Sequence, residues 1–377
     1  MHADVVIVGA GPAGCAAAFD LTSRGLRVLL LDRTAFPRRK PCAGGLTVKA
    51  LRALRYCVAP VIQRTVQNLA VSCRLQNPKV FIGNDPICHL VERSSFDLFC
   101  LEKTVAAGAE FRVVNRIDGI LEGAAAVSLI ADGEAIQGRF LIGADGVHSR
   151  IRRITGRFPG IRFGFAVEAV LPASPRHDTT LSFDFGQAAG GYGWVFPKKN
   201  HTNVGLYTHR CDGVIRRKDL DAYIFRKLGH VRHEPIRGYA LGLGGWRYRP
   251  GWGRILLAGD AAGLVDPLLG EGLYHAIVSG QRAAAAIGAA VNDDSDACQS
   301  YAKALVPIQR ELLFSQAAAA FFYRLPVLGH GLLISPAARI PLMKGFARGM
   351  SLLPIFLNGY RFWLGRSLPK QHSREPF

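Results

Sequence analysis

Residues 4–14 read DVVIVGAGPAG and residues 27–32 read RVLLLD. The first stretch is a short apolar run that ends in a glycine turn, and small and apolar side chains at helical spacing follow it as far as Arg24. The second stretch is another apolar run, and it ends at Asp32. Strand, glycine turn, helix and strand within about thirty residues predict the βαβ unit of a dinucleotide-binding fold.

The turn has the spacing G-x-G-x-x-G, formed by Gly9, Gly11 and Gly14. Gly9 allows the tight turn, Gly11 lets a pyrophosphate approach the backbone, and Gly14 allows the helix to pack closely. The N-terminus of the helix supplies N–H groups and partial positive charge, and Asp32 is placed to accept hydrogen bonds from ribose hydroxyls. The turn predicts a site for an ADP moiety, which FAD and NAD share.

Size and charge narrow the class of protein. A chain of 377 residues that is 49% hydrophobic and 20% charged predicts a globular protein of two domains. The 47 Lys and Arg exceed the 28 Asp and Glu, and the net charge of +19 attracts anions: nucleic acid, phosphorylated substrates or anionic lipid head groups. The sequence has no zinc-finger spacing, RNA-recognition signature or aromatic-interleaved basic run, so nucleic acid is not an expected partner.

Cysteine spacing and hydropathy point to the cytoplasm. The eight cysteines form neither a C-x-x-C pair nor a regular framework, which favours a reducing compartment and predicts no metal site. The first strand begins within a few residues of Met1, so no secretory leader is expected. No stretch reaches the roughly 18 uncharged apolar residues of a spanning helix, so any contact with a membrane is expected to be peripheral, on its inner face.

Three later segments indicate which nucleotide is bound. Residues 91–97 read VERSSFD, residues 140–146 read FLIGADG and residues 255–263 read ILLAGDAAG. The last two are apolar strands that run into small-residue turns with an acid. In this order the segments resemble the glutathione-reductase-like superfamily of FAD proteins, which includes p-hydroxybenzoate hydroxylase and related reductases.

This resemblance implies roles for individual residues. Asp260 would contact the ribityl chain of FAD, Asp145 and Gly146 would lie near the pyrophosphate, and Arg93 would lie over the cofactor. FAD is therefore the predicted cofactor.

Three further motifs resemble the geranylgeranyl reductase family. Residues 191–198 read GYGWVFPK, and the Tyr-x-Trp-x-Phe-Pro motif of that family lines an elongated prenyl pocket beside the flavin. Residues 40–46 read KPCAGGL, where Ala43 replaces a glycine common in the family, and residues 266–274 read DPLLGEGLY. A helix that begins at this last turn would stabilise negative charge on the reduced flavin ring.

The resemblance implies a complete set of site residues. The predicted cofactor-binding residues are Gly9, Gly11, Pro12, Ala13, Gly14, Asp32, Arg33, Lys40, Cys42, Ala43, Gly44, Arg93, Asp145, Gly259, Asp260, Pro267, Gly270, Gly272 and Leu273. The predicted substrate pocket is Tyr192, Trp194, Phe196 and Pro197, and the predicted catalytic residues are Cys42, Tyr192 and Trp194.

The implied reaction is the saturation of isolated double bonds in a prenyl lipid or prenyl diphosphate. An isolated alkene is a poor hydride acceptor, so hydride from reduced flavin must be matched by a proton to the neighbouring carbon, and placement carries much of the catalysis. Cys42 and Tyr192 are candidates for delivering that proton or positioning the alkene. Lys198, Lys199 and His201 are interpreted as a solvated turn rather than a phosphate site.

The electron donor and two other functions stay open. Residues 242–245 read GLGG but follow no convincing strand, so NAD(P)H would dock transiently, or reduced ferredoxin would act as the electron-donor protein. The same fold and FAD residues suit a flavin monooxygenase or halogenase. A membrane-surface electron-transfer flavoprotein is a second alternative.

The predicted fold is α/β, α+β overall: a Rossmann-like FAD-binding domain from residues 1–75, 85–160 and 240–300, an antiparallel-sheet substrate domain at 161–239, and a C-terminal helical segment at 301–377 that ends in a flexible tail. Beyond Leu312 we expect short helices broken by Pro326, Pro336, Pro341 and Pro354.

Residues 312–377 hold eight Lys or Arg and one acid, Glu375. The apolar run at 352–357 and the aromatic Tyr360, Phe362 and Trp363 suit a membrane interface, and nearby basic side chains would reach lipid phosphates. These basic residues are Arg348, Arg361, Arg366 and Lys370. A helical cap on the substrate domain is the alternative.

Overall fold

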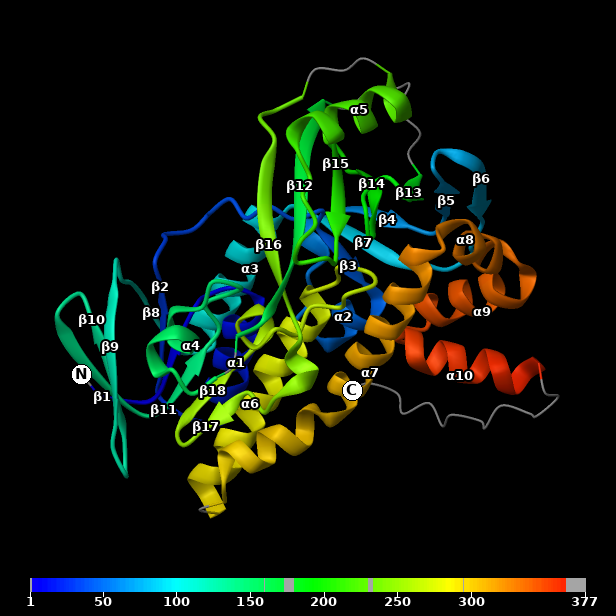
Figure 1. The fold of residues 1–377 in the computed structure, drawn as a ribbon. Helices are drawn as coiled ribbons and strands as arrows, with labels where there is room; N and C mark the ends of the chain where they lie inside the picture. The colour runs from blue at the N-terminus through cyan, green and yellow to red at the C-terminus, as the bar shows by residue number, and fades with distance from the viewer. Residues whose placement is uncertain (1, 159, 173–179, 230–232, 294, 364–377) are drawn as a thin grey trace.

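The computed structural model describes residues 2–158, 160–172, 180–229, 233–293 and 295–363. In Figure 1 a parallel sheet, an upright antiparallel sheet and a group of C-terminal helices stand next to one another. The mixed α/β architecture confirms the predicted fold class.

An eight-stranded sheet carries the predicted βαβ unit. Its central strands β18, β11, β1, β2 and β8 are parallel, in that spatial order, and β17, β10 and β9 add antiparallel pairs. The strands span β1 (His2–Val8), β2 (Val28–Asp32), β8 (Glu110–Val113), β9 (Ile117–Glu122), β10 (Val127–Ala131), β11 (Glu134–Gly143), β17 (Gly251–Trp252) and β18 (Ile255–Leu257). The sheet therefore joins strands from the beginning of the chain to strands more than two hundred residues later.

Helices α1 (Pro12–Thr22), α3 (Arg93–Ala106) and α6 (Leu273–Asp293) pack together beside this sheet. Gly9, before α1, has a φ of +105°, and a β-carbon there would lie 2.3 Å from Ala144 O. A β-carbon on Gly280 of α6 would lie 2.1 Å from Ala13 O. Only glycine fits these two places, because side-chain atoms would overlap the backbone.

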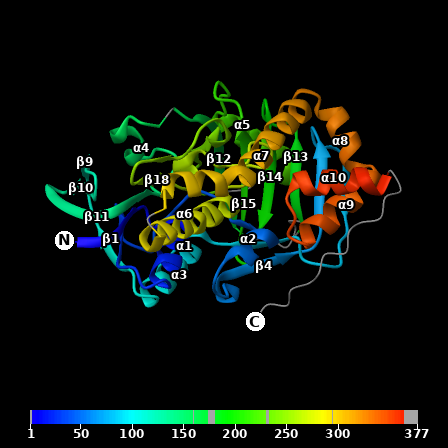
Figure 2. The ribbon, with the colours of Figure 1, turned by 90° about the horizontal axis from the view of Figure 1, so that it is seen from below.

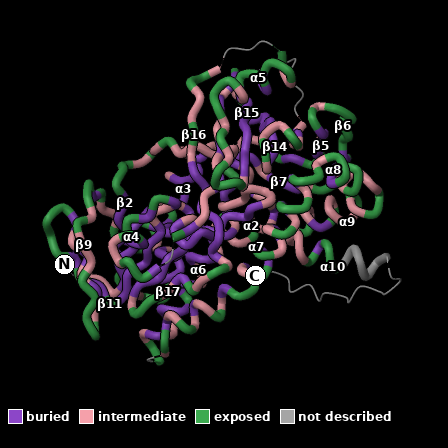
Figure 3. The backbone as a smooth tube through the Cα atoms, in the orientation of Figure 1, coloured by how far each residue is buried: buried purple, intermediate pink, exposed green. Residues whose placement is uncertain are grey.

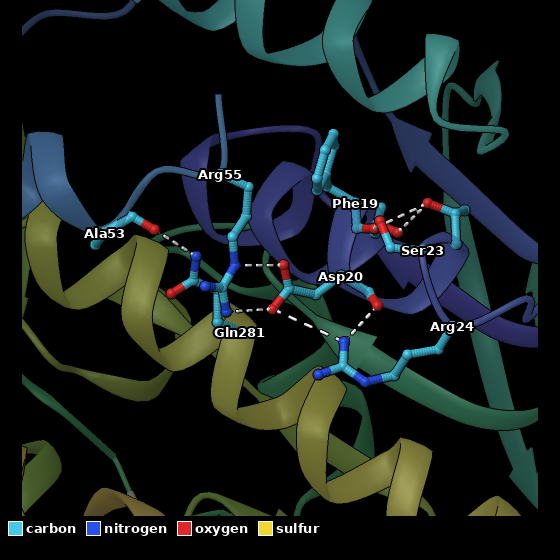
Figure 4. A network of polar contacts seen from close by, with 9 residues as sticks. Phe19, Asp20, Ser23, Arg24, Ala53, Arg55 and Gln281 are labelled. Atoms are coloured by element: carbon cyan, nitrogen blue, oxygen red, sulfur yellow. Dashed lines mark hydrogen bonds and ion pairs between the residues drawn. The ribbon is translucent and has the colours of Figure 1, made fainter. Parts of the chain in front are cut away.

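A buried carboxylate links α1 to the turn after α2 (Val48–Ala53) (Figure 4). Asp20 is 4% exposed and accepts two hydrogen bonds from Arg55, each 3.0 Å long. Next to this pair, Gln281 of α6 donates to Ala53 O at 2.6 Å. These bonds tie both α1 and α6 to the end of α2 and the turn after it.

A seven-stranded sheet stands against the first, in the order β16, β12, β15, β14, β13, β5, β6. All neighbours are antiparallel except β13 and β5. The strands span β5 (Leu69–Cys73), β6 (Gln76–Phe81), β12 (Arg162–Pro172), β13 (Leu181–Phe185), β14 (Gly191–Pro197), β15 (His201–Thr208) and β16 (Arg237–Leu243).

The membership of this sheet differs from the predicted domain limits. Strand β5 lies within residues assigned to the FAD-binding domain, and β16 continues past residue 239. The expectation that residues 242–245 follow no strand is wrong, because β16 ends at Leu243. A 3-10 turn, η2 (Gly245–Arg247), follows instead of the long helix that a second nucleotide cradle needs. The domain division itself stays a proposal.

Smaller elements complete the fold. A three-stranded sheet joins β3 (Gly45–Thr47), β7 (Cys88–Val91) and β4 (Ile62–Val66). The remaining elements before the C-terminal helices are α4 (Arg150–Thr155), α5 (Arg217–Leu228), η1 (Ala59–Val61) and η3 (Gly259–Ala262).

The C-terminal helices are α7 (Ala297–Arg324), α8 (Pro326–Ile334), α9 (Pro336–Ala347) and α10 (Leu352–Trp363). Figure 2 shows α7 beside α6, and α8 contacts β5 at the far end of the seven-stranded sheet. The prediction that four prolines separate the C-terminal helices is right for two of them and wrong for the other two. Pro326 and Pro336 begin helices, where a missing N–H costs nothing, but Pro341 lies inside α9 and Pro354 in the first turn of α10. The expected tail at 368–377 lies outside the described residues.

Candidate active site

One cavity of about 1180 Å³ runs from the glycine turn to the antiparallel sheet. Its wall includes the Gly9–Ala13 turn, the 38–45 loop, the 144–150 segment, the 269–273 turn and the inward face of the seven-stranded sheet. This volume is above the usual range for a single ligand site, so the cavity can take a large cofactor and a substrate together.

The end of the cavity at the glycine turn is polar. Asp32 Oδ2 accepts from Ala10 N at 2.8 Å, which fixes the turn, and Asp145 Oδ2 accepts from Arg150 N at 2.5 Å. A β-carbon at Gly11 would meet only Arg38 Nη2, at 3.6 Å, so this stretch of backbone faces open space. Arg38 Nε and Asp145 Oδ1 are buried and have no hydrogen-bond partner within the described ranges. The exposed backbone at Gly11 and the unpaired Nε–H of Arg38 are donors on one wall, and they fit a nucleotide pyrophosphate.

Most of the predicted cofactor residues line this cavity. Those on its wall are Gly9, Gly11, Pro12, Ala13, Asp32, Arg33, Lys40, Cys42, Ala43, Gly44, Arg93, Asp145, Asp260, Gly270, Gly272 and Leu273. Gly14, Gly259 and Pro267 lie behind it. A β-carbon on Gly14 would lie 1.8 Å from Gly9 O, so this glycine serves packing.

Charged side chains of both signs also line the cavity or lie just behind its wall. Arg93 is buried and donates from Nε and Nη2 to both carboxylate oxygens of Asp97, at 2.7 and 2.8 Å. Burial raises the pKa of Asp260, and the charges of Lys40 and Arg93 oppose this rise. Asp260 thus lines the cavity within electrostatic reach of two cations.

Aromatic side chains form the floor of the other end. Tyr192, Trp194 and Phe196 alternate along β14, and cross-strand register places Phe183 opposite Trp194. The ring centroid of Phe183 lies 5.2 Å from that of Tyr192 and 5.6 Å from that of Phe196, and both pairs are edge to face. Three of the four predicted pocket residues line the cavity; Pro197 does not. Phe346 of α9 and the following Met350 complete the apolar wall.

Tyrosine hydroxyls hold the 267–269 backbone. Tyr192 Oη donates to Leu269 O at 2.5 Å and Tyr207 Oη donates to Pro267 O at 3.0 Å, while Tyr323 donates to Leu268 O. Burial raises the pKa of Tyr192. These bonds give Tyr192 a positioning role toward the 269–273 turn.

The 40–46 loop lies against the antiparallel sheet. Cys42 N donates to Glu168 Oε1 at 3.2 Å, and Gly44 N donates to Cys42 Sγ at 3.4 Å. A β-carbon on Gly44 would lie 2.0 Å from Val91 O, so the loop approaches the backbone of β7 closely. Cys42 therefore stands on the cavity wall between the polar end and the aromatic floor.

Comparisons with known proteins agree with this arrangement. A family described as FAD binding domain matches residues 2–207. An uncharacterized protein of Methanosarcina barkeri is 36% identical over 291 residues, covering 76% of this chain and 75% of that protein. Digeranylgeranylglycerophospholipid reductase 1 of Methanopyrus kandleri is 31% identical over 320 residues, covering 79% of this chain and 84% of the relative.

The chain belongs to the geranylgeranyl reductase family of FAD-dependent oxidoreductases. A menaquinone reductase of Mycobacterium tuberculosis is also similar, with 30% identity over 308 residues, 75% of this chain and 76% of the relative. The crystal structure of a geranylgeranyl bacteriochlorophyll reductase-like protein of Thermoplasma acidophilum has the same fold, with a TM-score of 0.79, 22% identity and 96% of each chain covered.

Some residues of this family member were not predicted as site residues. Lys49 is buried on the cavity wall, 2.9 Å from Glu271 Oε2 and 3.6 Å from Glu311 Oε1. Glu168 is 7% exposed. An acid inside the apolar run FAVEAVL was the one sequence signal for Glu168, whereas Lys49 lies in a short helix without a motif.

The interpretation of Lys198 as part of a solvated turn is wrong. Lys198 is 4% exposed, and its Nζ lies 3.5 Å from Glu92 Oε2. His201 Nε2 lies 3.1 Å from the same oxygen. The neighbouring Lys199 is exposed, as expected.

We predict that Gly11→Val and Asp260→Ala each lose most of the bound FAD. Valine at position 11 would fill the space in front of the backbone that faces the pyrophosphate, and alanine at 260 would remove a polar partner of the ribityl chain. The Gly11→Val variant should fold, because a β-carbon at Gly11 would meet only the end of the Arg38 side chain in the described part of the chain. Flavin absorbance after gel filtration measures the loss, with circular dichroism as the folding control. Full flavin content in both variants would contradict the site.

Proposed function

We propose that this FAD-dependent oxidoreductase saturates isolated double bonds of a geranylgeranyl-type prenyl chain carried by a lipid or a diphosphate. The observation that supports the proposal most is the continuity of the cavity: the polar end that fits FAD and the aromatic end that fits an apolar chain share one volume. The relatives named for digeranylgeranylglycerophospholipid and menaquinone agree in being reductases.

FAD, when bound and reduced, supplies the hydride. The Gly9–Gly14 turn, Asp32 and Asp260 would hold its ADP and ribityl parts, and the N-terminus of α6 would favour negative charge on the ring. Phe183, Trp194 and other floor residues would hold the prenyl chain and exclude water. Cys42, on the wall between the two ends, would deliver the proton.

Lipid analysis of cells that express the protein tests this function. We expect prenyl lipids or quinone tails to gain pairs of hydrogen atoms relative to cells that express the Gly11→Val variant. The class of lipid that changes identifies the substrate. Unchanged lipid masses across prenyl diphosphates, ether lipids and quinones would contradict the proposal, and oxygenated or halogenated products would favour the alternative monooxygenase or halogenase.

We predict that Cys42→Ala keeps the flavin but slows alkene reduction, by up to the roughly 10²-fold to 10⁴-fold typical of lost acid–base help. Tyr192→Phe should also slow it, because the bond that fixes Leu269 O is lost. Trp194→Ala should act mainly on substrate affinity or chain-length preference. Rapid mixing of reduced protein with substrate measures these rates. Cys57→Ala, at an exposed cysteine, is the matched control, and wild-type rates in Cys42→Ala and Tyr192→Phe would exclude both roles.

Association with an anionic membrane and supply of electrons by NAD(P)H or reduced ferredoxin are further parts of the proposal. In Figure 3 helices α8 to α10 are largely exposed or half-buried, unlike α6. Exposed apolar side chains on these helices and the end of α7 are Leu325, Val327, Leu328, Leu332, Ile340, Phe356 and Leu357, and exposed basic ones are Arg324, Arg339, Lys344 and Arg348. Arg361, Arg366 and Lys370 lie outside the residues whose side chains are described.

No helix within the described ranges is by itself long and apolar enough to cross a bilayer; α7 and α8 satisfy that test only jointly and are bent by 111°. Apolar side chains beside basic ones suit binding at the lipid surface, where each basic residue contributes about 1 kcal/mol.

We predict that the protein sediments with anionic liposomes at low salt and less at high salt, since salt screens the attraction. Leu328→Asp with Leu332→Asp should weaken sedimentation, whereas Leu121→Asp, at an exposed leucine on β9, should not. Protein that stays in the supernatant at low salt would leave the C-terminal helices as a cap on the cavity.

A further inference from the structure

A carboxyl group stands on the cavity-facing side of the seven-stranded sheet. Glu168 of β12 pairs with Gly205 of β15, which pairs in turn with Trp194 of β14. Residues directly opposite one another share a face of a sheet, so Glu168 lies on the face that carries the aromatic floor. In the adjacent row this face carries Ala166, Tyr207 and Tyr192, which line the cavity. An acid is out of place in a wall that only has to bind an apolar chain.

Glu168 contacts the backbone of Cys42 and lines the same small cavity as that residue. One oxygen, Oε1, accepts from Cys42 N, while Oε2 is buried without a hydrogen-bond partner in the described part of the chain. Asn203, whose Oδ1 accepts from Trp194 Nε1 at 2.7 Å, lies beside the same carboxyl. A carboxyl with one oxygen unpaired has an acceptor site available for a proton.

A second, smaller cavity of about 30 Å³ connects these groups to the surface. Cys42, Glu168, Glu92, Lys198 and His201 are among the residues that line it. Its volume is enough for one water molecule. The side chains of Glu92 and His201 are 38% and 23% exposed, so the outer wall of this cavity reaches solvent.

We propose that Glu168 passes protons from solvent to Cys42 and so replaces the proton consumed in each reduction. This inference rests on the proposed function. One carbon of the double bond gains a hydride, with its two electrons, from reduced flavin, and the other gains the proton of the Cys42 thiol. The π bond, the S–H bond and the bond that held the hydride break, and two C–H bonds form. Glu168 then gives its proton to the thiolate through a water molecule in the small cavity that both residues line, and it is protonated again from solvent. In each reduction, one alkene, one hydride and one solvent proton give one saturated carbon–carbon bond.

The electrostatics of Glu168 agree with this role. Burial raises the pKa of Glu168, and Glu92 raises it further, while Asn203, Lys198 and the N–H of Cys42 oppose the rise. Arg237 and Tyr239 face it from β16, and Cys42 and His201 complete its surroundings. A raised pKa keeps the protonated form to higher pH, so proton supply should fall as pH rises through that pKa.

Glu168→Gln tests the proposal, because the amide still accepts from Cys42 N but carries no acidic proton. In anaerobic repeated turnover, with dithionite as the reductant and a prenyl substrate in excess, Cys42 must regain its proton after each reduction, so we expect Glu168→Gln to react about 10-fold more slowly and to lose the decline of rate at high pH. The Asp variant, which keeps an acid, should recover part of the rate. Glu134→Gln, at an exposed carboxyl of β11, is the control. A Gln variant with the wild-type rate and pH profile, or a loss that is equal at every pH, would overturn the proposal.

A second measurement needs no turnover. The rate at which iodoacetamide alkylates Cys42 in the oxidised flavoprotein is followed against pH, with the Cys42 peptide quantified by mass spectrometry. Removing the carboxylate should shift the alkylation profile to lower pH in Glu168→Gln, because the thiolate loses a neighbouring negative charge. Identical profiles would overturn the proposal. If the wild-type protein reduces no prenyl substrate but the profiles differ, the proposed function fails, while the electrostatic coupling of Glu168 to the Cys42 thiol stands.

Discussion

Helices α1 and α6 meet at Gly280, whose missing side chain leaves room for the carbonyl of Ala13 at a distance that no β-carbon could share. This contact holds the helices that follow the Gly9–Gly14 turn and the 269–273 turn together, and both turns line the same cavity. The Arg55–Asp20 pair fixes α1 to the segment after α2. Close packing at glycine therefore determines where the cofactor end of the cavity lies and where the aromatic floor must stand relative to it.

The two ends of the cavity have opposite chemistry. Backbone N–H groups, Arg38 and Asp260 suit a charged and polar cofactor, whereas Phe183, Trp194 and Phe196 suit an apolar chain. A reaction between the two requires that water be excluded where they meet and that a proton be supplied there. These opposite demands account for the approach of the 40–46 loop, which carries Cys42, to the buried carboxyl of Glu168 where the two ends of the cavity meet.

Much of this could be predicted from local sequence. The βαβ unit follows from the spacing of Gly9, Gly11 and Gly14 and from apolar runs, and the aromatic floor from alternation along 191–197. Contacts that depend on register could not be predicted. Glu168 meets Cys42 because the 40–46 loop lies against β12, across a separation of 126 residues in the sequence, and β5 joins the second sheet by a pairing that no motif marks. The predicted break at Pro341 is wrong for a related reason. The packing of α9 outweighs the hydrogen bond that a proline inside a helix loses.

The central claim is that a prenyl double bond and the flavin react inside one cavity, and anaerobic reoxidation measures this most directly. The flavoprotein is reduced in the absence of oxygen and mixed with a geranylgeranyl-bearing substrate, while the flavin spectrum and the mass of the substrate are followed together. The account predicts that oxidised flavin returns in step with the addition of one pair of hydrogen atoms to the chain. A flavin that stays reduced with every prenyl substrate and is reoxidised only when oxygen is admitted would contradict it.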